Sequence, residues 1–210
     1  FRCPHLLTLH DKGQAYRHIF VGSQGVWSTI VAINGADRWR MSIIGSAQQN
    51  ALGIEDIHAA IRRAVGVDFD YEILSVEPWV RRELLADHYR WARVFLAGDA
   101  AHVNNPIGGL GLNCGIHDAM DLADTLQQVI EGSAPFELLE RYDRRRRPLN
   151  IEYVQQQTIA NKKRLEETDP AVREANFDQL RRTANDPAQA KAFLMKSSLI
   201  ESVRKASRIT

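Results

Sequence analysis

Hydrophobic and polar positions alternate through residues 15–45 in the manner of β-strands. The segments AYRHIFV, VWSTIVAI and RWRMSII follow one another there, separated by GSQG and by a turn that contains Asn34 and Gly35. Because Asn-Gly is frequent in β-hairpin turns, this pattern predicts successive antiparallel strands.

The pattern changes to a helical period between Gly53 and Gly66. Acidic and basic residues surround one apolar stripe, which consists of Ile54, Ile57, Ile61 and Val65. We expect an amphipathic helix between the two glycines. A strand from Tyr71 to Val80 is expected to follow it.

The last third of the chain is predicted to be helical. Ser133 and Pro135 resemble a helix cap followed by a first-turn proline. Pro148 is expected to end or kink the helix that they open. Asp-Pro pairs repeat this start further on and predict two more helices, over about residues 170–184 and 187–206.

Between these regions lies the stretch RVFLAGDAAHVNNPIGGLGLN, residues 93–113. Its apolar run from Val94 to Ala97 indicates a buried strand, which stops at Gly98 and Asp99. A glycine-rich turn follows, and an amphipathic helix begins close to Asn113. We expect the strand to be parallel to its neighbours in a larger sheet whose faces are covered.

The order of strand, carboxylate, glycine-rich turn and helix start suits a ligand with both hydroxyl groups and an anionic end. A carboxylate such as Asp99 accepts hydrogen bonds from hydroxyls. Glycines let a flat ligand approach the main chain, and a helix N-terminus attracts negative charge through its unpaired N–H groups. A plain strand-to-helix connection with glycines in its turns is the alternative, and the ordered combination favours a ligand site.

The motif GDAAH, followed by P-x-G-G-x-G-x-N and a helix with DA-x-x-LA, resembles the second flavin-contacting motif of the single-component FAD-dependent aromatic hydroxylases. These enzymes are the para-hydroxybenzoate and phenol hydroxylase group. The match runs without gaps from Arg93 to about Ala123, and looser similarity covers most of the remaining chain. The resemblance implies FAD as cofactor, NAD(P)H and O2 as co-substrates, and hydroxylation of a phenolic or other aromatic compound.

The resemblance also implies a set of contacts to FAD. Asp99 would hold a ribityl hydroxyl, and the Pro106 turn would lie beside the edge of the flavin ring where oxygen adds. The backbone at the helix start would face the pyrimidine edge, where a helix N-terminus is worth about 0.3–2 kcal/mol to an anion and so favours the reduced flavin. The full set of cofactor-binding positions is Gly98, Asp99, Pro106, Gly109, Gly111, Leu112 and Asn113.

In this family a sheet over the flavin forms one wall of the aromatic pocket. Trp27 and Thr29 share one face of the second predicted strand, which makes them candidate substrate contacts. The sequence alone does not decide which face meets the substrate, and most of these positions are expected to be sheet core. No catalytic side chain is assigned beyond the Pro106 turn beside the ring.

The sequence departs from the family in two respects. It contains no strand followed by G-x-G-x-x-G, the fingerprint that binds the FAD pyrophosphate, and it lacks the family's middle Asp-Gly motif. We therefore expect the chain to be the C-terminal portion of a longer enzyme. Its partner would be a nucleotide-binding N-terminal half, without which it would bind FAD weakly and be inactive.

Composition and charge exclude several other classes of function. The net charge of +1 gives no field that would attract nucleic acid or an anionic membrane, and no apolar run approaches the roughly 20 residues of a membrane span. The cysteines and histidines lack metal-ligand spacing, so no metal site is predicted. His102 is expected to stabilise its loop, and the arginine run 144–147 to be a solvated face at a helix end.

The predicted fold class is mixed α/β (α+β), with an antiparallel substrate-domain sheet, one flavin-domain strand–loop–helix unit and a helical C-terminus. We assign residues 1–90 to part of a substrate-binding domain, 91–168 to part of an FAD-binding domain and 169–210 to C-terminal helices. The expected protein is a cytoplasmic flavoprotein monooxygenase of aromatic compound catabolism. A related FAD-dependent halogenase or reductase and a non-catalytic module that binds a partner chain are the alternatives, and a homodimer is left open.

Overall fold

The computed structural model describes residues 1–45 and 52–210, which form two compact units. One unit comprises residues 1–80 and 165–168, and the other comprises residues 81–164 and 169–210. The fold is mixed α/β with antiparallel sheets and several helices, so the predicted fold class is confirmed. In the part of the chain that the structure describes, no helix is both long and apolar enough to cross a bilayer.

The first unit is built on a three-stranded antiparallel sheet in the order β1-β2-β3. The strands are β1 (Arg17–Gly22), β2 (Gly25–Ala32) and β3 (Trp39–Ile43), as predicted for residues 15–45. The Oδ1 atom of Asn34 closes the turn before β3, because it accepts hydrogen bonds from the backbone N–H groups of Ala36, Asp37 and Arg38. Gly35 takes a φ of +70° there, a value that glycine adopts at little cost.

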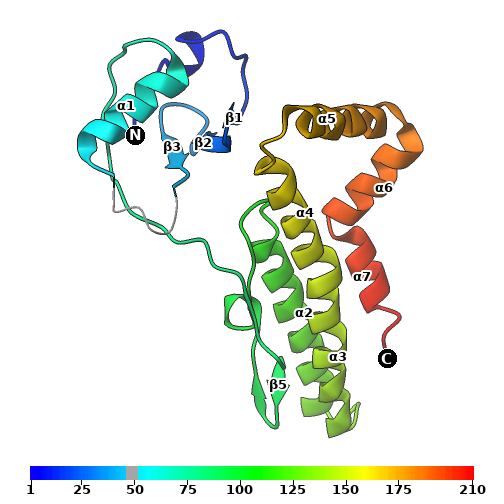
Figure 1. The fold of residues 1–210 in the computed structure, drawn as a ribbon. Coiled ribbons are helices and arrows are strands. Elements are labelled where there is room, and N and C mark those ends of the chain that lie inside the picture. Colours follow the sequence, from blue (N-terminus) through cyan, green and yellow to red (C-terminus); the bar gives the residue numbers. More distant parts are fainter. Residues whose placement is uncertain (46–51) are drawn as a thin grey trace. The chain divides into compact units, whose positions relative to one another are not determined.

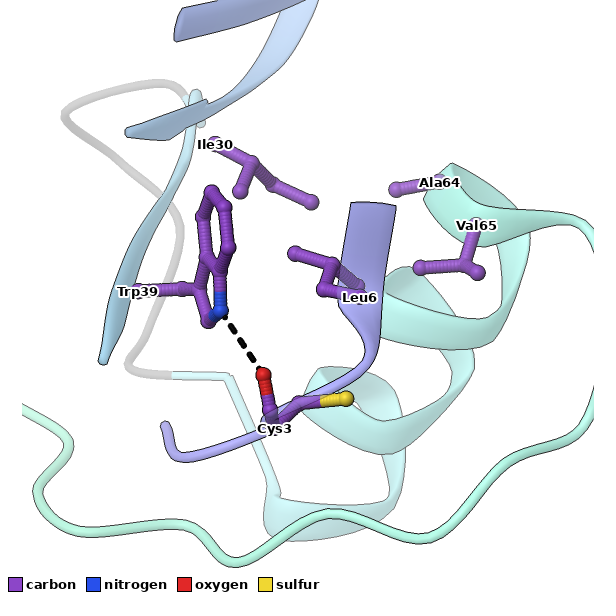
Figure 2. Close-up of a cluster of buried hydrophobic side chains, with 6 residues drawn as sticks. All are labelled: Cys3, Leu6, Ile30, Trp39, Ala64 and Val65. Carbon is purple, nitrogen blue, oxygen red and sulfur yellow. Dashed lines mark hydrogen bonds between the residues drawn. The ribbon is translucent and has the colours of Figure 1, made fainter. Parts of the chain in front are cut away.

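The predicted helix of this unit is α1 (Ile54–Val65), with Gly53 as its N-cap and left-handed Gly66 as its C-cap. Its C-terminal end, through Ala64 and Val65, packs against the sheet and the short 3₁₀ turn Leu6–Thr8, whereas Ile54 at the start of the predicted apolar stripe is 52% exposed. Figure 2 shows the resulting core, in which side chains from the turn, the sheet and α1 point toward one another: Cys3, Leu6, Ile30, Trp39, Ala64 and Val65. The indole N–H of Trp39 donates to the carbonyl oxygen of Cys3 at 3.0 Å, which satisfies the one polar atom of that ring.

The strand predicted from Tyr71 to Val80 does not form, and that prediction is wrong. Among the residues that the structure describes, the segment makes one antiparallel bridge, between Glu72 and Arg2, and is otherwise irregular. Tyr71 packs against the core, whereas apolar residues further along are exposed, among them Val76 and Trp79. The alternating pattern gives the segment the propensity of a strand, but a strand also needs a neighbouring backbone along its length, and only Glu72 has one.

The second unit contains two short antiparallel ribbons. One pairs β4 (Leu84–Leu85) with β7 (His102–Val103), and the other pairs β5 (Arg90–Trp91) with β6 (Val94–Phe95). Within this chain β6 pairs antiparallel with the segment just before it, and Val94 is 62% exposed, so the strand predicted for Val94–Ala97 is not buried here. The parallel neighbours, most of which were expected from the N-terminal half outside this chain, stay a prediction. An apolar run fixes neither the partner nor the direction of a strand.

The helices of the second unit form a bundle (Figure 1). The helix predicted after the glycine-rich turn is α2 (Gly111–Ile130). Beside it run α3 (Glu140–Leu149), a π-helical segment (Asn150–Gln155) and α4 (Gln156–Leu165), which follow one another without interruption.

Pro148 lies close to the helix end predicted for it, whereas Ser133 differs from its predicted role. Pro148 is the next-to-last residue of α3, which ends at Leu149. Because proline has no N–H to give to the preceding turn, the hydrogen-bond register changes just after it, into the π-helical segment. Ser133 does not cap a helix: its hydroxyl donates to the carbonyl of Gln128, and a 3₁₀ turn (Phe136–Leu139) leads into α3.

The two predicted Asp-Pro helix starts are confirmed. The side chains of Asp169 and Asp186 each accept hydrogen bonds from two backbone N–H groups at the starts of α5 (Pro170–Asn185) and α6 (Pro187–Ser197). The second predicted helix is divided, however, because Leu199 adopts a left-handed φ of +61° before α7 (Ile200–Ala206). This conformation places Leu199 in a buried cluster with five other residues: Leu110, Cys114, Leu149, Tyr153 and Val154.

We predict that Leu199→Ala lowers the free energy of unfolding by about 2–5 kcal/mol, the range for large-to-small core substitutions. The Leu199 side chain is 2% exposed, whereas that of Leu194, in the preceding helix, is 61% exposed. The control Leu194→Ala should change stability by less than about 0.5 kcal/mol. Urea unfolding of the three proteins measures both values, and equal effects would contradict the buried placement of Leu199.

Candidate functional site

The predicted site residues of the second unit lie on three consecutive pieces of backbone. Gly98 and Asp99 form a 3₁₀ turn with Ala100, in which the Asp99 side chain is exposed. Pro106 opens a turn closed by the N–H of Gly109, which donates to the Pro106 carbonyl at 3.1 Å. The remaining positions, Gly111, Leu112 and Asn113, are the first three residues of α2.

The N-terminus of α2 is open to a ligand. No side chain caps it, and the first helical hydrogen bond runs from the N–H of Cys114 to the carbonyl of Leu110 at 2.9 Å. The three N–H groups before Cys114 therefore carry the partial positive charge of the helix end. A Cβ atom added at Gly109 or Gly111 would meet no atom within 4 Å, so a flat group can approach this backbone.

The 3₁₀ turn and α2 touch through two glycines. A Cβ atom on Gly115 would stand 3.0 Å from the Cα atom of Gly98, a tighter contact than most Cβ atoms make, so the two backbones would have to shift apart. Gly115 is about one helical turn, or roughly 5.4 Å, from the start of α2 at Gly111. The structure thus brings the Asp99 turn close to the α2 N-terminus, and both contribute to one surface.

Beneath that surface lies a buried charged cluster around Asp118 of α2, which is 0% exposed. Its Oδ2 atom accepts hydrogen bonds from His102 Nε2 at 2.6 Å and from the Gly98 N–H at 3.2 Å. Its Oδ1 atom accepts a hydrogen bond from Arg146 Nε at 2.7 Å. We call Asp118, His102 and Arg146 the buried triad.

The arginine run is therefore not the solvated face that the sequence predicted. Arg146 is 2% exposed, and its neighbour Arg145 pairs with Asp121 of α2 at 2.5 Å. Arg147 donates from Nε to the carbonyl of Ala86 at 2.9 Å. Only Arg144 fits the prediction, with an exposed i,i+4 pair to Glu140. A run of four arginines on a helix faces in several directions, and the acidic partners that bury two of them lie on another helix.

His102 has the structural role that the sequence predicted for it. Its side chain is buried, stacked 6.0 Å from the ring of Tyr89, and its Nδ1 atom lies 2.8 Å from the side-chain amide of Asn104. Burial by itself would lower the pKa of His102, but hydrogen bonds to Asp118 and then to Cys114 raise the pKa to about 9. The raised pKa favours the protonated form of His102, which donates from Nε2 to Asp118.

Three residues of this region could in principle bind a metal ion: the donor atoms of His102, Cys114 and Asp118 lie within 4.8 Å of one another. Those of Asp118 and His102 are already engaged in hydrogen bonds. The Arg146 guanidinium is a fixed positive charge in the same cluster, and it would repel a cation. The cluster is therefore better explained as structural than as a metal centre.

The candidate substrate contacts Trp27 and Thr29 lie in the first unit, on β2. The guanidinium of Arg63 lies 4.2 Å from the centre of the Trp27 ring, a cation–π contact. Trp27 also lines an open depression with side chains of β1 and α1, whereas Thr29 is 9% exposed and does not line it. The structure gives these two residues different surroundings, and their contact with substrate stays a prediction.

Sequence reasoning missed Asp118 and Arg146 as parts of the site. A signal for Asp118 was available: it lies four residues after Cys114, on the buried face of α2, where a carboxylate needs a charged partner. For Arg146 no such signal existed, because nothing in a run of arginines distinguishes the buried member from its neighbours.

An exposed carboxylate, an uncapped helix start and open backbone at two glycines lie on one surface of the second unit. A family model described as an FAD binding domain matches residues 20–157, which is more than half of the chain. The chain belongs to this family.

Two relatives and one solved structure illustrate the similarity. The chain is 48% identical over 97 residues to 4-methyl-5-nitrocatechol 5-monooxygenase of Burkholderia sp, covering 46% of this chain and 18% of that protein. It is 30% identical over 199 residues to para-nitrophenol 4-monooxygenase of Pseudomonas sp. (strain WBC-3), covering 90% of this chain and 47% of that protein. The crystal structure of p-nitrophenol 4-monooxygenase PnpA from Pseudomonas putida DLL-E4 superposes with a TM-score of 0.72 at 25% identity, covering 90% of this chain and 49% of that one.

These comparisons support the resemblance inferred from the GDAAH motif. The relatives are named monooxygenases, and the family to which the chain belongs is described as an FAD binding domain. The chain spans less than half the length of each of these relatives.

We predict that the buried triad makes stability depend on pH. The pKa of His102 is about 9 in the folded chain and about 6.5 in an unfolded one. The contribution of protonated His102 to the free energy of unfolding is therefore complete below about pH 6.5 and is lost as pH rises through about 9. Its upper limit is about 3 kcal/mol. Urea unfolding at about pH 6 and about pH 10 should show a larger loss of stability in the wild-type chain than in His102→Gln.

The control for this measurement is His5→Gln, since His5 is an exposed histidine of the first unit. Its pH dependence should match that of the wild-type chain. If the curve of His102→Gln also ran parallel to the wild-type curve, His102 would not gain protonation on folding.

Proposed function

We propose that this chain forms the flavin-contacting and substrate-binding part of a monooxygenase that hydroxylates a phenolic or other aromatic compound with FAD, NAD(P)H and O2. The observation that carries the proposal is the shared surface of the Asp99 turn and the α2 N-terminus. Asp99 offers an exposed carboxylate, and the start of α2 offers uncapped N–H groups beside open space at Gly109 and Gly111. Few ligands other than a flavin combine a polyhydroxyl chain with a flat ring that becomes anionic.

The chain's own groups would have distinct tasks toward FAD. Asp99, beside Gly98, would accept a hydrogen bond from a ribityl hydroxyl. The N–H groups of Gly111, Leu112 and Asn113 would face the pyrimidine edge and stabilise negative charge there. FAD itself would supply the redox and oxygen chemistry, and the protein would orient it and exclude water.

The Pro106 turn would lie beside the edge of the ring at which oxygen adds. Its geometry is fixed from two sides, since the N–H of Ile107 donates to Asn105 Oδ1 and the N–H of Gly109 donates to the Pro106 carbonyl. A fixed turn can shield the reacting edge from water without a catalytic side chain. Trp27 and Thr29 would contribute to the substrate wall.

The relatives favour an aromatic substrate, since those reported above are named for a nitrocatechol and a nitrophenol. They are also longer than this chain, which agrees with a partner segment that binds the nucleotide part of FAD. We place the enzyme in the cytoplasm, where NAD(P)H is available; the two cysteines, Cys3 and Cys114, are free and buried, as is usual in a reducing compartment.

The proposal is tested by adding FAD to the chain alone and to the chain joined to an N-terminal dinucleotide-binding half. Flavin fluorescence should be quenched strongly in the joined form, and phenolic compounds should stimulate its NAD(P)H oxidation with formation of a hydroxylated product. Binding without hydroxylation would favour the halogenase or reductase alternative. A joined form that ignores FAD would favour a non-catalytic module and overturn the proposal.

We predict that Asp99→Ala weakens FAD binding in the joined form by about 1.5–3 kcal/mol, the value of a charge-assisted hydrogen bond. Asp99 is exposed, so the free energy of unfolding should change by less than about 0.5 kcal/mol. The matched control is Asp124→Ala, which removes an exposed acid from the middle of α2 and should leave FAD affinity unchanged. Equal FAD affinity in both variants would remove Asp99 from the site.

We further predict that Gly111→Ala separates folding from flavin binding. Alanine is favoured over glycine in a helix by about 1 kcal/mol, and the added Cβ atom meets no neighbour within 4 Å. The midpoint temperature of thermal unfolding should therefore stay the same or rise slightly. The methyl group should, however, obstruct the approach of the flavin ring and weaken FAD binding. A variant that binds FAD as well as the wild-type protein would place the ring away from the α2 N-terminus.

A further inference from the structure

The pieces of backbone that the proposed function assigns to FAD are short and irregular, and they need an external support. The Asp99 turn is a single 3₁₀ turn, and the Pro106 turn is a loop. Neither is part of a large sheet, since β6 and β7 are two-residue strands in separate ribbons. The question is what holds these pieces in register with α2.

Asp118 is the point at which all of them meet. Its Oδ2 atom accepts a hydrogen bond from the N–H of Gly98, the residue before Asp99, at 3.2 Å. The same oxygen accepts a hydrogen bond from His102 at 2.6 Å. His102 in turn contacts the amide of Asn104 at 2.8 Å, two residues before Pro106. One carboxylate on α2 is therefore connected to both irregular turns.

The other oxygen of Asp118 fixes the carboxylate itself. Arg146 of α3 donates to it from Nε at 2.7 Å, and Arg146 Nη2 also reaches the carbonyl and the sulfur of Cys114. Asn150, in the π-helical segment, donates to the same sulfur at 3.3 Å. The Asp118 carboxylate is thus connected to α3 and to the segment after it, which gives this side chain a single orientation.

We propose that Asp118 is the positioning residue of the flavin-contacting surface: with His102 and Arg146 it sets the Asp99 turn and the Pro106 turn against the N-terminus of α2. This inference rests on the proposed function for its meaning, because the surface that it positions is the one assigned to FAD. Asp118 is buried and does not touch the ligand, so its effect on binding is exerted through the two turns.

The chain offers a matched control for Asp118. Asp121 also lies on α2 and also pairs with an arginine of α3, Arg145, at 2.5 Å, with 14% of its side chain exposed. The contacts of its side chain do not include the Asp99 turn or the Pro106 turn. Asp118→Asn and Asp121→Asn therefore each weaken an ion pair between α2 and α3, but only the first removes an anchor of the turns.

The first measurement is hydrogen exchange in the chain without FAD. In Asp118→Asn the backbone amides of residues 97–109 should exchange about tenfold or more faster than in Asp121→Asn, when the two are compared at equal global stability set by urea. The amides in the second half of α2 should exchange alike in both variants. Equal exchange of residues 97–109 in the two variants would overturn the inference.

Because Asp118→Asn leaves Arg146 and His102 with a weaker partner, it is able to unfold the second unit altogether. Asn104→Ala is the second, milder variant, since it cuts only the link between His102 and the Pro106 turn. It should speed exchange at Ile107 and Gly109 and leave that of Gly98 and Ala101 as in the wild-type chain. Unchanged exchange at Ile107 and Gly109 would overturn the proposed link to the Pro106 turn.

The second measurement is the dissociation constant of FAD in the joined form. It should rise by about tenfold or more in Asp118→Asn, since displacement of binding groups by about 1 Å has effects of this size or larger, and stay within about twofold in Asp121→Asn. If Asp99→Ala weakens FAD binding and Asp118→Asn does not, the turn needs no anchor and the inference fails alone. If neither variant affects FAD binding, the proposed flavin site fails and the inference fails with it.

Discussion

The second unit depends on one buried carboxylate. Asp118 lies on a helix among apolar side chains, and a charge in that position is stable only when it is paired and fully hydrogen-bonded. Arg146 and His102 satisfy it from two directions, and the Gly98 N–H satisfies it from a third. Removing one partner of such a buried pair typically costs about 3–5 kcal/mol, so the cluster constrains every element that contributes to it.

This constraint accounts for the composition of the neighbouring backbone. Gly98 and Gly115 touch so closely that a Cβ atom on Gly115 would lie 3.0 Å from the Gly98 Cα atom, and the short approach is what lets the Gly98 N–H reach the helix. The glycines of the motif therefore have two separate uses. Gly98 and Gly115 permit close packing, whereas Gly109 and Gly111 leave open space on the outer side.

A second support lies at the start of α2. Leu110, the N-cap of α2, packs with Leu149 and Tyr153 from one continuous helical stretch and with Leu199 from near the C-terminus. The π-helical segment after Pro148 and the left-handed Leu199 both belong to this contact. Two departures from regular helix are therefore located where they hold the start of α2, and regular helices would present other side chains to Leu110.

Local periodicity was sufficient for most of the secondary structure. The strands of residues 15–45, the helix between Gly53 and Gly66 and the Asp-Pro helix starts followed from patterns whose physical cause is local: alternation, glycine conformations and side-chain caps. The motif from Arg93 to Asn113 was likewise enough to identify the FAD-binding family, because its glycines and its carboxylate are close together in the sequence. For the same reason the sequence predicted the glycine-rich turn and the helix after it, although the strand before them is a two-residue strand of an antiparallel ribbon.

The sequence did not show which strands would pair or which charged side chains would become buried. Val94 pairs backward with β5, the segment after Tyr71 finds one partner residue only, and Arg146 is buried while Arg144 is exposed. Each of these outcomes depends on which backbone or charge lies nearby after folding, and no local pattern encodes that. The sequence by itself determined the elements and the chemistry of the motif; the tertiary structure decided that a single carboxylate on α2 would hold that motif in place, because only the folded chain brings Asp118, His102 and Arg146 together.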